Sequence, residues 1–234
     1  MSAGALESIR IWKTEDYSYY GAAVPLMEWA QTLPTPANVE TTIDEQGRVI
    51  RVGMGGGDIN DNGMSHLSAL KHLENFQLTF AYGCTDKGLE YLKDLKNMKV
   101  LNLGSHTFGE GVIHLGGMTK LEQLTLHKVR ADDESLKFMR NLKQLKILSM
   151  TLNPVATDKG MEHLAELREL ESLYLTCSNL TDNCLEIFAP MKKLKTLTIS
   201  SPQITKKGLR ELCKPLPLLE TVDRQPVEKF LTED

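Results

Sequence analysis

Paired cysteines, long apolar runs and a strong excess of one charge are all missing from this 234-residue chain. None of the four cysteines belongs to a CxxC pair, so the sequence predicts neither a zinc site nor a disulfide framework. No apolar run approaches the roughly 18–20 residues that a membrane helix needs. The net charge of −4 argues against nonspecific binding to nucleic acid or to acidic membranes.

The first residues, Met1–Trp12, also lack a basic segment followed by an apolar one, which is the pattern of a secretory signal. A secreted chain trimmed of its signal would look the same. Reduced thiols are the expected state of the cysteines, and a cytoplasmic location is therefore predicted. Hydrophobic residues make up 41% of the chain, which suffices for a sizeable core.

Residues 1–38 do not repeat, and most of the larger aromatic side chains lie here. They include Trp12, Trp29, Tyr17, Tyr19 and Tyr20. Ala22–Leu33 is predicted to form a short helix with Pro25 in its first turn. The aromatic residues have two interpretations, a cap over the open end of the core or a binding patch. Asn38–Met54 then predicts a β-hairpin, with Gly47 at a turn position that needs a positive φ.

From Val49 onwards an apolar-x-x-apolar-x-apolar block recurs. Its central residues, spaced 23 to 25 residues apart, are Val52, Phe76, Leu101, Leu124, Leu148, Leu173, Leu197 and, in a degenerate copy, Val222. A period of this length with this block predicts one strand and one helix per unit.

A second signature follows the blocks, with Thr or Asn, then an acid, and a small residue in the fourth position. Its clearest copies begin at Asn60, Thr85, Thr157, Thr181 and Thr205. The Thr or Asn is predicted to cap the helix, and the acid to favour the helix dipole. The fourth residue is Gly63, Gly88, Gly111, Ser135, Gly160, Cys184 or Gly208. Glycine weakens a helix, so a close approach to the sheet or to a neighbouring helix is predicted there.

These signatures resemble the leucine-rich repeat family, in its ribonuclease-inhibitor-like branch with T-D-x-G-L repeats, over residues 49–222. The resemblance implies an α/β solenoid (horseshoe) of about 7–8 repeats, with a curved parallel β-sheet on the concave face and α-helices on the convex face. Members of the family mostly bind other proteins. The pattern departs from the family at Gly109–Val112 and at Asp132–Ser135, where the helix cap is altered.

In such an architecture, the strand residues beside the central apolar positions face the concavity. The candidate partner-binding residues are Asn75, Gln77, Asn102, Gln123, Thr125, His127, Ser149, Thr151, Tyr174, Thr176 and Thr198. They are almost all uncharged. Two interpretations stay open: side chains with strand propensity on a solvated sheet, or a polar recognition surface with Tyr174 and His127 as its largest central anchors.

Neither catalysis nor a cofactor is predicted. His127 has no acid among its expected neighbours, as a Ser/His/Asp arrangement would require. Gly53–Asp58 lies between a strand and a helix but lacks the third glycine of a dinucleotide fingerprint and the Gly-Lys-Ser/Thr of a P-loop.

Two charge patterns complete the sequence. The charge alternates in sign at the position two residues before each central apolar residue, and this alternation predicts ion pairs between neighbouring strands. The residues are Glu74, Lys99, Glu122, Lys146, Glu171, Lys195 and Glu220.

Lys192–Lys214 holds seven basic residues and one acid. Its candidate basic patch is Lys192, Lys193, Lys206, Lys207, Arg210 and Lys214. This patch is either a solvated surface or a docking site for an acidic partner.

The sequence therefore predicts an N-terminal cap (1–48), leucine-rich repeats (49–222) and a C-terminal tail or cap (223–234). The leading functional hypothesis is a non-catalytic scaffold that binds a protein or peptide. The alternatives are a structural subunit or adaptor of a larger complex, and an anion or small-ligand binder that uses the basic patch.

Overall fold

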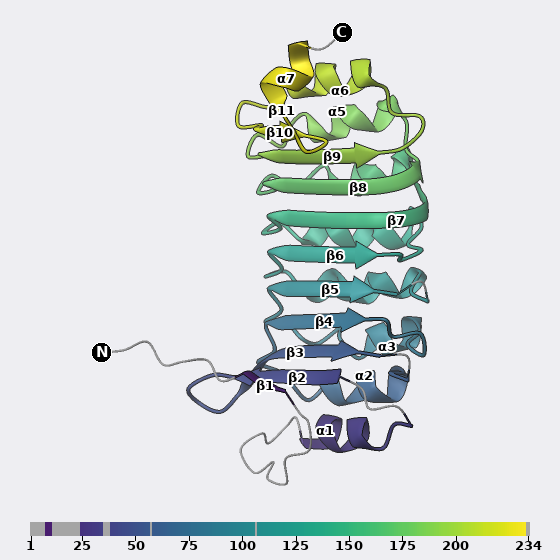
Figure 1. The fold of residues 1–234 in the computed structure, drawn as a ribbon, viewed down its shortest axis with the longest axis vertical. Helices are drawn as coiled ribbons and strands as arrows, with labels where there is room; N and C mark the ends of the chain where they lie inside the picture. Colours follow the sequence, from purple (N-terminus) through teal and green to yellow (C-terminus); the bar gives the residue numbers. More distant parts are fainter. Residues whose placement is uncertain (1–7, 11–23, 35–37, 57, 106, 233–234) are drawn as a thin grey trace, which may run out of the picture.

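The computed structural model describes residues 8–10, 24–34, 38–56, 58–105 and 107–232. Within these residues, eleven strands form one sheet in which they follow one another in sequence order (Figure 1). The strands are β1 (Ser8–Arg10), β2 (Asn38–Ile43), β3 (Val49–Gly55), β4 (Asn75–Thr79), β5 (Val100–Gly104), β6 (Gln123–His127), β7 (Ile147–Thr157), β8 (Ser172–Asn179), β9 (Thr196–Ser200), β10 (Thr221–Val222) and β11 (Gln225–Pro226).

Short helices connect the strands and lie behind the sheet in Figure 1. The α-helices are α1 (Val24–Gln31), α2 (Asp61–Leu67), α3 (Asp86–Glu90), α4 (Asp158–Met161), α5 (Leu185–Phe188), α6 (Lys206–Cys213) and α7 (Val227–Thr232). The 3₁₀ helices are η2 (Glu110–Gly117), η3 (Ser135–Asn141), η4 (Glu162–Leu164) and η5 (Asp182–Cys184). No helix among the described residues is long and apolar enough to cross a membrane.

Strands β3 to β10 run parallel, as the strand-and-helix period predicts, while both edges of the sheet are antiparallel. At one edge β1, β2 and β3 pair antiparallel, and at the other β10 pairs with β11. The predicted hairpin at Asn38–Met54 is confirmed as β2 and β3, and Gly47 has a φ of +73° in its turn.

The apolar lattice read from the sequence forms one continuous core. Each block places its apolar residues between the sheet and the helices, and the central ones from Val52 to Val222 are fully buried. Fully burying a leucine side chain stabilises the fold by about 1.5–3 kcal/mol. Because every unit repeats this burial against its neighbours, the core extends along the whole stack.

The predicted helix caps are confirmed where Thr or Asn begins the second signature. Asn60 Oδ1 accepts from Asn62 N at 3.0 Å, and the Thr205 hydroxyl accepts from Gly208 N at 2.9 Å. The expectation of α-helices throughout is wrong: η2 and η3 at the two altered starts are 3₁₀ helices, and so are the short η4 and η5 beside α4 and α5. Gly109 offers no side chain to accept from the first turn of η2, and a tighter i to i+3 turn follows.

The acid of the second signature does more than favour its own helix dipole. Asp158 accepts from Thr181 N at 2.8 Å and from the Thr181 hydroxyl at 2.5 Å, and Thr181 belongs to the next unit along the chain. The same pair of hydrogen bonds joins Asp61 to Thr85, Asp133 to Thr157 and Asp182 to Thr205. We call these contacts the carboxylate bridges. Each bridge ties the start of one helix to the start of the next.

The bridges also explain the small fourth residue. A Cβ atom added to Gly88 would lie 2.6 Å from Asp61 Oδ1, and one added to Gly208 would lie 2.6 Å from the Asp182 carboxyl group. The predicted close approach is therefore confirmed, and the group approached is the bridging carboxylate of the preceding unit. Gly63 belongs to the first unit and faces the Trp29 ring of α1 instead, which a Cβ atom at this position would overlap.

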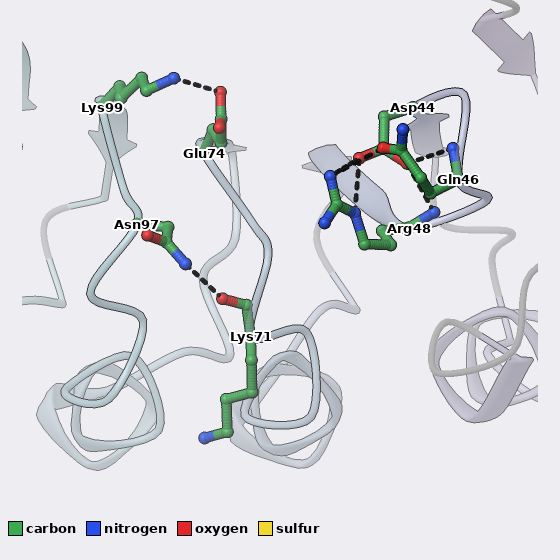
Figure 2. A network of polar contacts seen from close by, with 7 residues as sticks. All are labelled: Asp44, Gln46, Arg48, Lys71, Glu74, Asn97 and Lys99. Atoms are coloured by element: carbon green, nitrogen blue, oxygen red, sulfur yellow. Dashed lines mark hydrogen bonds and ion pairs between the residues drawn. The ribbon is translucent and has the colours of Figure 1, made fainter.

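The alternating charges form ion pairs on the strand-entry side of the sheet. Lys99 Nζ lies 2.7 Å from Glu74, Lys146 Nζ lies 2.7 Å from Glu122, and Lys195 Nζ lies 2.6 Å from Glu171. Figure 2 shows the first of these pairs beside the Asn97 side chain, which donates to Lys71 O at 3.0 Å. Each lysine therefore pairs with the glutamate of the preceding unit. The hydrogen bond between Lys146 and Glu122 lowers the pKa of the Glu122 carboxyl group and raises the pKa of the Lys146 amino group.

We expect Lys146→Glu to lower the melting temperature more than Lys146→Ala. The glutamate would stand between Glu122 and Glu171, whereas alanine only removes one exposed ion pair. Melting curves at low and high salt measure the difference, which screening should shrink. Equal melting temperatures for the two variants would show that the alternation contributes nothing to the stacking of the strands.

The ends of the stack are closed by elements outside the period. Among the described residues helix α1 spans Val24–Gln31 and ends two residues earlier than predicted, and its Trp29 is 8% exposed. This placement favours the cap interpretation for Trp29, while Trp12, Tyr17, Tyr19 and Tyr20 lie outside the described residues. At the other end, residues 225–232 form β11 and α7.

Candidate functional site

The strand register arranges the side chains that point away from the helices into three rows, which we call the open face. The first row is Arg51, Asn75, Val100, Gln123, Ile147, Ser172, Thr196 and Thr221. The second is Gly53, Gln77, Asn102, Thr125, Ser149, Tyr174 and Thr198. The third is Gly55, Thr79, Gly104, His127, Thr151, Thr176 and Ser200.

All eleven candidate partner-binding residues lie in these rows. They are spread over β4 to β9, and at about 4.8 Å per strand the outermost are some 24 Å apart. The geometry therefore gives an extended surface rather than one pocket. Hydroxyl and amide groups dominate it, and Arg51 carries the one permanent charge in the three rows.

Tyr174 and His127 occupy different parts of the open face. Tyr174 lies in the second row between Ser149 and Thr198 and is half-buried. His127 lies in the third row, exposed, and its Nδ1 atom is 2.8 Å from the Thr151 hydroxyl. They stand on β6 and β8, so they would contact separate parts of a partner.

Several polar atoms of the rows are already buried. Asn75 Oδ1, Asn102 Oδ1 and Thr198 Oγ1 are covered and have no hydrogen-bond partner among the described residues. Leaving a buried acceptor without a partner costs free energy. These three oxygens therefore do not contribute to the stability of the sheet.

The candidate basic patch is partly neutralised within the fold. Lys193 and Lys214 form ion pairs with Glu169 and Glu211. Lys192 Nζ donates to Pro215 O at 2.7 Å, and Arg210 Nε donates to Phe230 O at 3.4 Å. The exposed Lys206 and Lys207 begin α6.

Lys206 has a structural explanation. It occupies the position that holds the bridging acid in other units, and no further second signature follows it to donate a threonine hydroxyl. A carboxylate would have no bridge to form there. Lys206 also lines a hollow of about 560 Å³ with Asp223 and Arg224, where burial raises the pKa of Asp223.

The described residues offer little for catalysis. No group of three or more His, Cys, Asp or Glu side chains in this part of the chain could hold a metal ion. Burial raises the pKa of Cys84, Cys177 and Cys184 to about 12 and that of Cys213 to about 11. These thiols stay protonated at neutral pH and are poor nucleophiles.

Sequence reasoning missed the residues that directly follow the third row. Phe80, Lys128 and Leu152 each come one residue after a third-row position and have φ values of +54°, +59° and +57°. Phe80 is 67% exposed and Leu152 is 50% exposed, and Tyr82 nearby is 53% exposed. For Phe80 and Leu152, an apolar residue directly after a third-row position and outside the repeat lattice was the available signal.

The same loops frame a second hollow, of about 270 Å³, at the ends of β4, β5 and β6. It is lined by Leu78, Thr79, Phe80, Tyr82, Asn102, Leu103, Gly104, Thr125, His127 and Lys128. Thr79 and Gly104 belong to the open face, but only Asn102, Thr125 and His127 of this lining were candidates from sequence.

No family model matches the chain, and no curated protein matches it. Among solved structures, the chain is similar to an internalin from Listeria monocytogenes, with a TM-score of 0.63 and 20% sequence identity. The similarity covers 75% of this chain and 48% of the internalin, so the chain spans about half the length of that protein. The internalin is a leucine-rich repeat protein, and the chain accordingly has an α/β leucine-rich repeat fold.

Proposed function

We propose that the chain is a non-catalytic scaffold of the ribonuclease-inhibitor-like branch that binds a protein or peptide partner through the open face. The observation that carries the proposal is the three-row arrangement of polar side chains on a sheet whose opposite side is fully buried. The backbone of these rows is held by hydrogen bonds to both neighbouring strands. Such a surface is pre-organised, and binding to it loses little conformational entropy.

The size of the open face suggests how a partner would sit. From β3 to β9 the rows extend about 29 Å, and five residues along a strand span about 16 Å. The resulting area of about 450 Å² is smaller than the roughly 800 Å² that each partner contributes to a stable interface. A partner of the open face would therefore also contact the residues beyond the third row, where Phe80, Tyr82 and Leu152 are exposed.

The cysteines agree with an intracellular site of action. All four are free and buried. Free thiols persist in a reducing compartment such as the cytoplasm.

Pull-down with purified variants tests the proposal. We expect Gln123→Ala/His127→Ala/Tyr174→Ala to lower partner recovery at least about tenfold, because aromatic side chains near the centre of an interface contribute most of the binding energy. The matched control is Lys206→Ala/Lys207→Ala, which removes exposed charge from the basic patch and should leave recovery unchanged. Undiminished recovery with the triple variant would remove the open face as the binding surface, and loss with the double variant alone would favour the basic patch.

A further inference from the structure

The hollow at the ends of β4, β5 and β6 exists because Gly104 has no side chain. Gly104 lies in the third row between Thr79 and His127. A Cβ atom there would meet only Leu78 O, at 3.5 Å, which is an ordinary contact. Gly104 also does not have the positive φ that favours glycine at Gly47. Neither packing nor backbone geometry requires this glycine, so its effect is to leave the space open.

Aromatic side chains form one wall of this space. Phe80 and Tyr82 lie in the loop after β4, line the hollow and are more than half exposed. Phe80 has a left-handed backbone, which is unfavourable for a bulky L-residue. The same left-handed backbone recurs at Lys128 and Leu152, so it belongs to this position of the unit and not to Phe80 alone. The exposed Phe80 ring contributes nothing to the core, and a contact with a partner would account for its exposure.

Basic and neutral polar groups close the other side. The His127 ring is oriented by its contact with Thr151, and Lys128 follows it with its side chain exposed. Among the described residues Lys128 forms no ion pair, and no acid lines the hollow. The charge at this site therefore complements a carboxylate.

The volume indicates what fits. About 270 Å³ lies below the roughly 300–1,000 Å³ of pockets that enclose a drug-sized molecule. It is sufficient for one large side chain that projects from a chain lying over the open face.

Resting on the proposed function, we propose that the Gly104 hollow is the anchor pocket for one aromatic or large aliphatic side chain of a partner peptide. A neighbouring Asp or Glu of that peptide pairs with Lys128. The apolar side chain packs against Phe80 and Tyr82.

The probe is a phage-displayed dodecapeptide library selected on the intact chain. The enriched peptides should carry an aromatic or large aliphatic residue beside Asp or Glu. Gly104→Leu fills the hollow and should weaken their binding at least about tenfold. Gly53→Leu is the matched control. Gly53 lies on the same face, in β3, and a Cβ atom added there would have its nearest neighbour at 3.9 Å. The Gly53→Leu variant should bind the peptides like the wild type.

Two further variants give independent evidence. Lys128→Gln should weaken binding severalfold at low salt and little at high salt. Phe80→Asn removes the ring while asparagine accepts the left-handed backbone, so this variant should fold and should also bind at least about tenfold more weakly. If Gly104→Leu does not fold, the binding of Phe80→Asn tests the anchor pocket.

The outcomes separate the two proposals. If peptides lose binding with the Gln123/His127/Tyr174 triple variant but bind Gly104→Leu and Phe80→Asn normally, the anchor pocket is wrong and the open face stands. If no enriched peptide depends on any of these residues, or none is enriched, the anchor pocket is overturned, and the open face is decided by the pull-down with the triple variant.

Discussion

Asp158→Ala is expected to lower the free energy of unfolding by about 3 kcal/mol and the melting temperature by about 6–12 °C. Alanine removes a carboxylate that accepts two hydrogen bonds from Thr181, at 2.8 Å to the backbone nitrogen and 2.5 Å to the hydroxyl. Hydrogen bonds to a charged group contribute about 1.5–3 kcal/mol each, and partial exposure reduces the total. Urea unfolding monitored by circular dichroism measures the loss.

Glu110→Ala is the matched control for this change. Glu110 is the first residue of η2, as Asp158 is of α4, and it is exposed and forms no hydrogen bond to the next unit among the described residues. Its replacement should change stability by less than about 0.5 kcal/mol. Asp158→Asn should fall between the two, because it keeps one acceptor for Thr181 N. If Asp158→Ala and Glu110→Ala are equally stable, the bridges do not hold the units together.

Gly111→Ala is expected to destabilise the chain by about 3 kcal/mol, at the upper end of the usual cost of overpacking. The added Cβ would lie 2.6 Å from Asp86 Cβ and 2.7 Å from Asp86 Cα. A flexible side-chain end could move away, but the Asp86 backbone cannot do so without shifting α3. The shift would also disturb the hydrogen bond from Gly109 N to Asp86 Oδ1, 2.8 Å long. Differential scanning calorimetry gives the change.

Gly104→Ala provides the contrast on the same scaffold. Its Cβ would contact Leu78 O at an unstrained 3.5 Å, so stability should be unchanged or raised by up to about 1 kcal/mol as the unfolded chain loses freedom. If Gly104→Ala and Gly111→Ala lose similar amounts of stability, glycine occurs at the fourth position because of backbone flexibility and not because of the limited space beside the carboxylate of the preceding unit.

The core could be predicted from sequence because burial follows a period. The central residues from Val52 to Val222 are nearly evenly spaced in the sequence. Because their strands run parallel, all of these side chains face the helices. The charge alternation from Glu74 to Glu220 could be predicted for the same reason, since equivalent positions in parallel strands lie side by side.

Contacts that join one unit to the next at other positions could not be predicted in the same way. Asp158 was interpreted as a partner of its own helix dipole, because nothing local shows that Thr181 lies within reach of its carboxylate. The 3₁₀ geometry of η2 and η3 depends on altered caps whose effect on the turn is not encoded by an apolar period.

The hollow depended on features that sequence patterns do not contain. The strand register places Gly104 on the open face. Its missing side chain leaves a hollow there only because Thr79 and His127 lie on either side of it. The left-handed conformation of Phe80 is unexpected for an aromatic residue, so its ring could not be placed at the rim from the sequence.

The carboxylate bridges all point in one direction, and this makes the two ends of the stack chemically different. At the first unit the Trp29 ring covers Gly63, where a preceding carboxylate would lie, and at the last unit Lys206 offers a cation in place of an acceptor. The terminal strands β1, β2 and β11 pair antiparallel with their neighbours. The described edges of the sheet therefore do not reproduce the contacts that join one unit to the next, and a second copy of these residues could not add to either edge by the same bridge and parallel pairing.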